Sequence, residues 1–242
     1  QVIVVTPPGK DGNVPPATLV AADISGADCV FKVGGAGAIA ALAYGTKSIQ
    51  KVDKICGPGN IFVTIAKRLV YGEVDIDGLA GPTETIVVAD DSASPAHCAR
   101  DLLAQAEHDV LSSAIMITTS AKLASAVDKE VEKQLKKLER ADIARKSLKE
   151  RGLIVIVDDM EQAIELANLY APEHLSLLMR DAALYAEGIR NAGGIFIGDS
   201  SPEVLGDYVA GPSHVMPTGG SARFNSPLNV NDFLKTTSVV AL

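Results

Sequence analysis

The sequence predicts an α/β protein with two doubly wound domains, each built on a parallel sheet. Short apolar runs rich in β-branched residues alternate with longer segments in which apolar residues recur at helical spacing. Alternating strands and helices lead to parallel sheets covered by helices on both faces. The 242 residues include 21 glycines and only 4% aromatic residues, which favours such a chain over an all-β binding module.

The first series of elements occupies residues 1–82. The expected elements, in chain order, are a strand at 1–6, a helix at 15–26, a strand at 28–33, a helix at 34–45, a short strand from 52 and a helix at 60–72. The first two helices end in glycine, a common stop signal. The last begins after a Gly-Pro-Gly turn, where Asn60 is placed to cap it.

The second series occupies residues 83–215. Strands are expected at 83–90, 114–119, 153–158, 174–179 and 194–199, and helices at 94–109, from 120 through about 150, at 159–170 and at 181–192. Ser94 is placed as the N-cap of its helix, with Pro95 at the first helical position.

Together the two series predict two doubly wound, Rossmann-like parallel-sheet domains, 1–82 and 83–215. The tail 216–242 receives no predicted element. Ligands of open parallel sheets bind beyond the carboxyl ends of the strands. We therefore expect the functional residues in the loops that follow strands.

Charge and composition exclude several classes of protein. The net charge is −8 and no basic face is apparent, so no nucleic-acid partner is expected. Residues 128–152 mix both signs of charge and indicate a solvated helical face. No apolar run is long enough for a membrane span, and no signal peptide is visible. The three scattered cysteines favour a reducing compartment, so we expect a cytoplasmic protein, or a stromal one if it comes from a plastid.

Two glycine-rich turns are candidates for contact with a dinucleotide. Gly35, Gly37 and Ala40 fit a loose G-x-G-x-x-A pattern between a strand and a helix, where backbone groups can approach a pyrophosphate. Residues 57–60 form a second turn that opens onto a helix and can present N–H groups to an anion. A connecting turn without any ligand explains either pattern equally well.

Polar residues near two other helices suggest a metal site. Gln105 and His108 are three residues apart and share one face at the end of a helix, with donor types that suit Zn²⁺ or Mn²⁺. Asp207 and His214 lie in a long loop-rich stretch, 204–220, of the kind that is usually functional. Asp207 would complete a three-ligand set, and His214 would contact a substrate. On local evidence alone, a solvated helix end is the simpler interpretation of the first pair.

Glu173 and His174 follow Pro172 at the start of an expected strand. An imidazole is suited to proton transfer near neutral pH. Adjacent side chains of a regular strand point to opposite faces, so the two can serve one ligand only if the turn at Pro172 breaks the alternation. A polar turn without function is the alternative.

In order along the chain, "VGGAGAIAALAYGT", "VDKICGPGNIFVTIAKR", "AGPTETIVVAD", "LLAQAEHD", "APEHL" and "LGDYVAGPSHVMPTGG" closely resemble histidinol dehydrogenases, and the resemblance covers essentially the whole chain. It implies a zinc-dependent, NAD-linked enzyme that oxidises L-histidinol to L-histidine through the aldehyde, the last steps of histidine biosynthesis. It also implies a homodimer whose partner subunit supplies a further zinc histidine.

The resemblance assigns roles to particular residues. Glu173 and His174 become the acid–base pair. The implied zinc ligands are Gln105, His108 and Asp207. These ligands, with Thr83, His174 and His214, would hold the substrate, and Asn60 and the backbone at Gly37 would contact NAD.

The chain departs from the family pattern in three ways. It lacks the N-terminal part and stops before the C-terminal zinc histidine, so we expect an excerpt of a longer enzyme. Gly37 stands where the family carries a glutamine that contacts NAD, which leaves only a backbone contact there. Two alternatives remain open: a related dehydrogenase of another small polar alcohol, such as a sulfonated diol, and a truncated, non-catalytic binding module.

Overall fold

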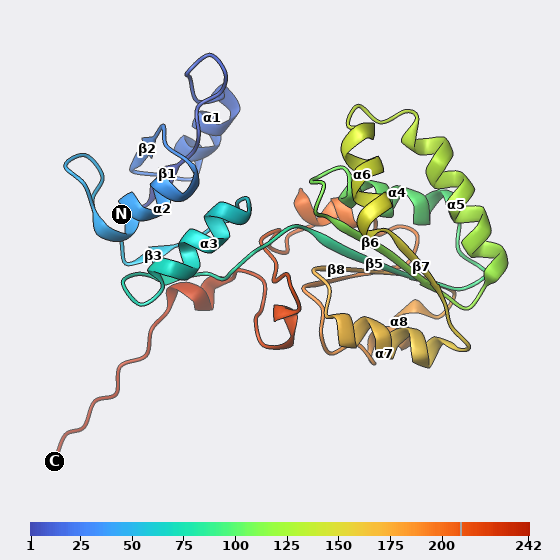
Figure 1. Ribbon diagram of the computed structural model, residues 1–242. Coiled ribbons are helices and arrows are strands. Elements are labelled where there is room, and N and C mark those ends of the chain that lie inside the picture. The colour runs from blue at the N-terminus through green and yellow to red at the C-terminus, as the bar shows by residue number, and fades with distance from the viewer. Residues whose placement is uncertain (209) are drawn as a thin grey trace. The chain divides into compact units, whose positions relative to one another are not determined.

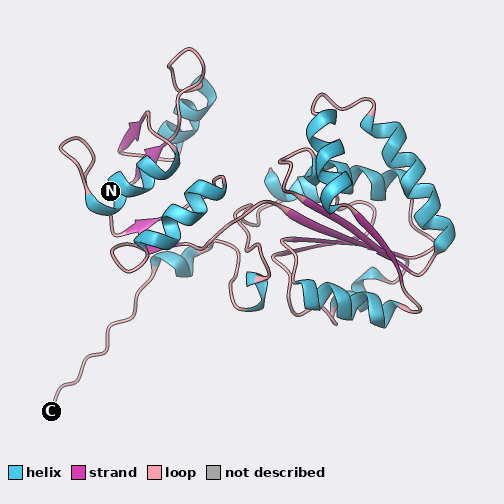
Figure 2. Ribbon diagram, viewed as in Figure 1, coloured by secondary structure: helices cyan, strands magenta, loops and turns pink. Residues whose placement is uncertain are grey.

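The computed structural model describes residues 1–208 and 210–242 (Figure 1). These residues divide into two compact units, Gln1–Gly81 and Pro82–Leu242. The residues 216–242 that received no predicted element belong to the second unit. Every strand pair in both units is parallel, which confirms the predicted α/β class (Figure 2).

The first unit contains two pairs of short strands and three helices. In chain order these are β1 (Ile3–Val5), α1 (Pro16–Ile24), β2 (Cys29–Phe31), α2 (Gly35–Tyr44), β3 (Lys54–Ile55), α3 (Ile61–Val70) and β4 (Asp75–Ile76). β1 pairs with β2, and β3 pairs with β4. Apolar residues of α2, α3 and these strands form one core, in which Ala43 is completely buried. β4 was not predicted, because a two-residue strand is too short to show any periodicity.

The second unit is built on one five-stranded sheet with the order β7-β6-β5-β8-β9. Its strands are β5 (Glu84–Ala89), β6 (Ser113–Thr118), β7 (Leu153–Ile156), β8 (His174–Leu178) and β9 (Gly194–Ile197). Its helices are α4 (Pro95–Ala106), α5 (Ala121–Leu135), α6 (Ala141–Arg151), α7 (Met160–Tyr170) and α8 (Ala182–Ala186). The strand order reverses between β5 and β8, which is the doubly wound arrangement.

Alternate residues of the central strands divide the core of this unit into two layers. Val87 and Ala89 of β5 pack with α4, α5 and α6. Ile86 and Val88 face the other way and pack with α7 and with Leu177 of β8. Figure 1 shows the two groups of helices on opposite faces of the sheet. This two-residue alternation explains why the strands are apolar on both faces.

One local prediction was wrong. The helix expected at 181–192 ends at Ala186, because the chain then makes turns in which Gly188 and Ile189 bond back to Tyr185 and Ala186. Ser94 is the N-cap residue of α4, as predicted, although its side chain makes no capping hydrogen bond there. Pro95 occupies the first helical position, also as predicted, where its φ is already suited to a helix.

Three short 3₁₀ helices follow the sheet: η1 (Glu203–Asp207), η2 (Ser221–Arg223) and η3 (Val230–Phe233). Met216, Thr218 and Ala222 are buried, so the beginning of the tail packs into the second unit. In the part of the chain that the structure describes, no helix combines the length and the apolar character needed to cross a membrane.

Candidate functional site

Several candidate residues of the second unit lie at the amino-terminal ends of its central strands. Thr83 immediately precedes β5, Glu173 immediately precedes β8, and His174 is the first residue of β8. These candidate residues therefore lie before or at the start of their strands, whereas functional residues were expected in the loops that follow strands. Asp90 lies at the opposite, carboxyl-terminal end of β5. Its carboxylate accepts the backbone N–H groups of Ser92 and Arg180, and so stabilises the loops after β5 and β8.

Glu173 and His174 meet although they are consecutive. Helix α7 ends at Tyr170, its C-cap residue Ala171 has the left-handed conformation with φ of 58°, and Glu173 lies outside β8. The alternation is thus interrupted just before His174, which pairs in register with Thr85 and Gly194. As a result, Nδ1 of His174 lies 3.5 Å from Oε2 of Glu173.

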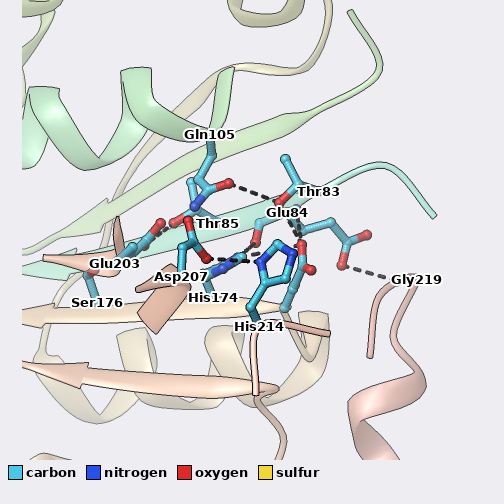
Figure 3. Close-up of polar contacts among 11 residues, drawn as sticks. Thr83, Glu84, Thr85, Gln105, His174, Ser176, Glu203, Asp207, His214 and Gly219 are labelled. Atoms are coloured by element: carbon cyan, nitrogen blue, oxygen red, sulfur yellow. Dashed lines mark hydrogen bonds and ion pairs between the residues drawn. The ribbon is translucent and has the colours of Figure 1, made fainter. Parts of the chain in front are cut away.

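The same oxygen of Glu173 is the centre of a small network. It accepts hydrogen bonds from the Thr83 hydroxyl (2.6 Å) and from the backbone N–H of Glu84 (3.2 Å). The Thr83 hydroxyl also lies 3.0 Å from Oε1 of Gln105, a buried side chain near the end of α4. The structure therefore joins Thr83, Gln105, Glu173 and His174 in one cluster, shown in part in Figure 3.

The imidazole of His174 is 4% exposed and stacks on Phe196, with ring centroids 5.9 Å apart. Burial by itself lowers the pKa of His174. The hydrogen bond to Glu173 and the negative charges of Glu203 and Glu173 act the other way, and together they raise the pKa of His174 above its usual value. The ring thus holds a proton more readily than a free histidine does.

A buried acidic network that sequence reasoning missed lies on the same face of the sheet. Oε1 of Glu203 accepts hydrogen bonds from Thr85 and from Ser176 (3.0 Å), and Ser176 Oγ also lies 2.9 Å from Oδ2 of Asp101. A hydroxyl has one hydrogen, so Ser176 bonds both carboxyl groups only if one of them is itself protonated. Burial raises the pKa of Glu203 to about 7 and raises the pKa of Asp101.

One sequence signal pointed to part of this network. Asp101 is four residues before Gln105 and therefore shares a helical face with it. Glu203 gave no such signal, because its neighbours in sequence belong to the loop after β9. Only the folded chain shows that Glu203 reaches Thr85 on β5, more than 100 residues away.

The predicted metal ligands differ in their surroundings. Gln105 is buried, Asp207 is partly buried, and His108 is exposed just after α4. Oδ1 of Asp207 lies 3.1 Å from Nδ1 of His214, so the two predicted residues of the loop-rich stretch do meet (Figure 3). Within residues 1–208 and 210–242, no group of three or more His, Cys, Asp or Glu side chains is arranged to hold a metal ion. The predicted set contains only two such residues beside Gln105.

Glu84 connects this edge of the sheet to the tail. Its Oε2 accepts the backbone N–H of Gly219 at 3.1 Å. Burial raises the pKa of Glu84 to about 7, with a smaller contribution in the same direction from the charge of Glu173. The tail is therefore held by a carboxyl group that titrates near neutral pH.

The predicted dinucleotide residues lie in the first unit, at the starts of two helices. α2 begins at Gly35, whose φ of 67° favours glycine, and a Cβ added at Gly37 would meet no atom within 4 Å. The side-chain oxygen of Asn60 accepts the N–H groups of Phe62 (3.1 Å) and Val63 (3.2 Å). Asn60 thus caps α3, as predicted.

Comparison with known proteins gives this geometry a context. The model of the histidinol dehydrogenase family matches residues 1–242. The chain is 59% identical over 240 residues to a histidinol dehydrogenase of Dehalococcoides mccartyi, covering 99% of this chain and 55% of that protein. It is 58% identical over 244 residues to that of Deinococcus radiodurans, covering 100% and 56%. The chain therefore spans little more than half the length of these relatives.

A solved structure supports the same family assignment. The crystal structure of histidinol dehydrogenase from Elizabethkingia anophelis is similar with a TM-score of 0.93 and 41% identity, over 97% of this chain and 54% of that one. An acetylating aldehyde dehydrogenase from Geobacillus thermoglucosidasius is similar with a TM-score of 0.56 at 16% identity, over 92% of this chain and 65% of that one, a likeness of fold alone. The match of the family model to all 242 residues and the high identity to several curated members confirm the resemblance of the motifs, and this chain belongs to the histidinol dehydrogenase family.

Proposed function

We propose that this chain is the core of a zinc-dependent, NAD-linked dehydrogenase that oxidises L-histidinol to L-histidine through the aldehyde, in two hydride transfers. The observation that carries the proposal is that the Thr83 hydroxyl and the His174 imidazole both approach Oε2 of Glu173, near the amino ends of β5 and β8. Membership of the histidinol dehydrogenase family supports the choice of substrate.

His174 is the proposed acid–base group. It is buried against Phe196, and Glu173 lies beside it to stabilise the ring once it carries a proton. In the first oxidation His174 takes the proton of the substrate hydroxyl as the hydride leaves. Before the second, Glu173 activates the water that adds to the aldehyde, and His174 again accepts a proton. A single general base typically contributes about 10²–10⁴-fold to the rate.

Gln105, His108 and Asp207 are the proposed zinc ligands. An amide oxygen, an imidazole and a carboxylate are donors that suit Zn²⁺. The buried Gln105 oxygen, which the Thr83 hydroxyl approaches to 3.0 Å, fits this assignment. When bound, zinc supplies a template that orients the substrate. We propose that Thr83 and His214 complete the substrate site and that a further ligand comes from the partner subunit of a homodimer.

Asn60 and the backbone at Gly37 are the proposed contacts with NAD. Both lie at helix starts, where N–H groups favour an anion. In this proposal, residues 1–82 bind the dinucleotide, and residues 83–215 carry zinc and the acid–base pair.

The proposal is tested by His174→Asn in the full-length protein, with His97→Asn on α4 as the matched control. We expect His174→Asn to lose most turnover with L-histidinol while its zinc content is unchanged, and the control to keep both. Loss of zinc from the variant would instead make His174 a ligand. Glu173→Gln should harm aldehyde oxidation more than alcohol oxidation; equal losses would contradict water activation by Glu173. A sulfonated propanediol tested beside L-histidinol decides between the two classes of substrate.

A further inference from the structure

A buried ion pair in the first unit has no role in the function proposed so far. Lys67 of α3 and Asp77, the residue after β4, form a direct salt bridge. Their side chains are only 2% and 3% exposed. Removing two charges from water is costly, and an apolar pair of the same volume is often at least as stable. Stability alone therefore gives no reason for charges at this position.

Both partners of the ion pair also bind backbone groups of the same residue, Gly57, in the turn after β3. The ammonium group of Lys67 donates to the carbonyl oxygen of Gly57 (3.1 Å), and Oδ2 of Asp77 accepts the N–H of Gly57 (2.7 Å). The φ of Gly57 is 116°, a conformation that side chains rarely adopt. The pair thus holds the first residue of the Gly57–Asn60 turn from both sides.

The rest of this turn is equally constrained. A Cβ at Gly59 would lie 2.6 Å from the side chain of Val63, so the turn packs tightly on α3. Asn60 caps the same helix. In the described part of the chain, the N–H groups of Gly59, Asn60 and Ile61 donate to no other group. The turn is therefore rigid at both ends and presents free donors between them.

We propose that Lys67 and Asp77 are positioning residues of the dinucleotide site, which hold the Gly57–Asn60 turn in the shape that binds NAD. They act through the turn and do not touch the ligand themselves. The inference rests on the proposed function, in which Asn60 contacts NAD. An apolar pair would preserve the core but would leave both backbone groups of Gly57 without partners, and the turn would then lose its fixed shape.

The test replaces the pair in the full-length protein by Lys67→Met together with Asp77→Leu. We expect the KM and the Kd for NAD to rise about tenfold, the loss of one or two well-placed hydrogen bonds. The kcat at saturating NAD and the KM for L-histidinol should change less than about twofold. A purely structural role would lower the melting temperature and the active fraction without this separation of KM from kcat.

The chain offers a matched control in Lys54→Met together with Asp75→Leu. That pair joins β3 to β4 across 2.7 Å but is more exposed, at 19% and 54%, and it does not bond Gly57. Its loss should leave the Kd for NAD unchanged. If the first double variant fails to fold, Lys67→Arg is the substitute, since it keeps the charge but changes the length and shape of the side chain. It must then raise the KM and the Kd for NAD while kcat changes little.

An unchanged Kd for NAD in a folded variant of the buried pair would overturn the inference. This outcome differs from failure of the proposed function, in which the unaltered protein itself would show no NAD binding by calorimetry.

Discussion

Replacing Glu203 by glutamine should make the protein more stable at alkaline pH. Glu203 is completely buried, and its Oε2 has no hydrogen-bond partner among the described residues. A glutamine keeps the Oε1 acceptor for Thr85 and Ser176 but cannot ionise. The substitution therefore removes a buried charge with little change of shape.

The magnitude follows from the pKa of Glu203, which burial raises from 4.5 to about 7. Between these values the folded state binds more protons than the unfolded state, so stability falls as pH rises. This contribution is fully present below pH 4.5 and fully lost above pH 7, and the loss is roughly 3 kcal/mol. Glu203→Gln should thus be nearly neutral at pH 5 and stabilising by about 2–3 kcal/mol at pH 8.

The assay is urea or thermal unfolding at pH 5 and pH 8, in the presence of a chelator so that no metal alters the local charge. The expected gain at pH 8 corresponds to a rise in melting temperature of roughly 5–10 °C. Glu165→Gln, on the exposed side of α7, is the control and should show no such dependence. An equal effect of Glu203→Gln at the two pH values would refute the reasoning, because Glu203 would then be ionised in the folded protein at both.

Three other predictions follow from single features of the structure. Asn60→Ala should lower the free energy of unfolding by about 1 kcal/mol through loss of the α3 cap, measured without NAD, whereas Asn60→Asp should retain most of it. Gly37→Gln should stabilise α2 by about 0.5–1 kcal/mol, because no atom obstructs a side chain there, and should lower the KM for NAD; an unchanged KM would show that the amide has no contact. Chelation should lower the melting temperature of the full-length protein but not that of His108→Ala. The lost free energy of unfolding should be about 4 kcal/mol if zinc is present at a thousand times its Kd.

Much of the fold was predictable because its signals are local. The apolar runs that became β5 and β8, Pro95 at the start of α4 and Asn60 before α3 each specify structure within a few residues. The ordered motifs also identified the family. Signals failed where an element is very short, as in β4, or where turns replace a helix, as after α8.

The same distinction between local and non-local signals holds for the candidate site. The sequence by itself determined which residue types are available, including the adjacent Glu173 and His174 and the spacing of Gln105 and His108. Only the tertiary structure decided that Glu173 and His174 share a contact, since this depends on the left-handed Ala171 ahead of β8. The edge of the sheet at which they lie, the approach of Glu203 to Thr85, and the clamp of Lys67 and Asp77 on Gly57 are likewise tertiary. Such contacts join residues brought together by folding, and buried charges and hydrogen bonds take their energy from that shared environment rather than from their neighbours in sequence.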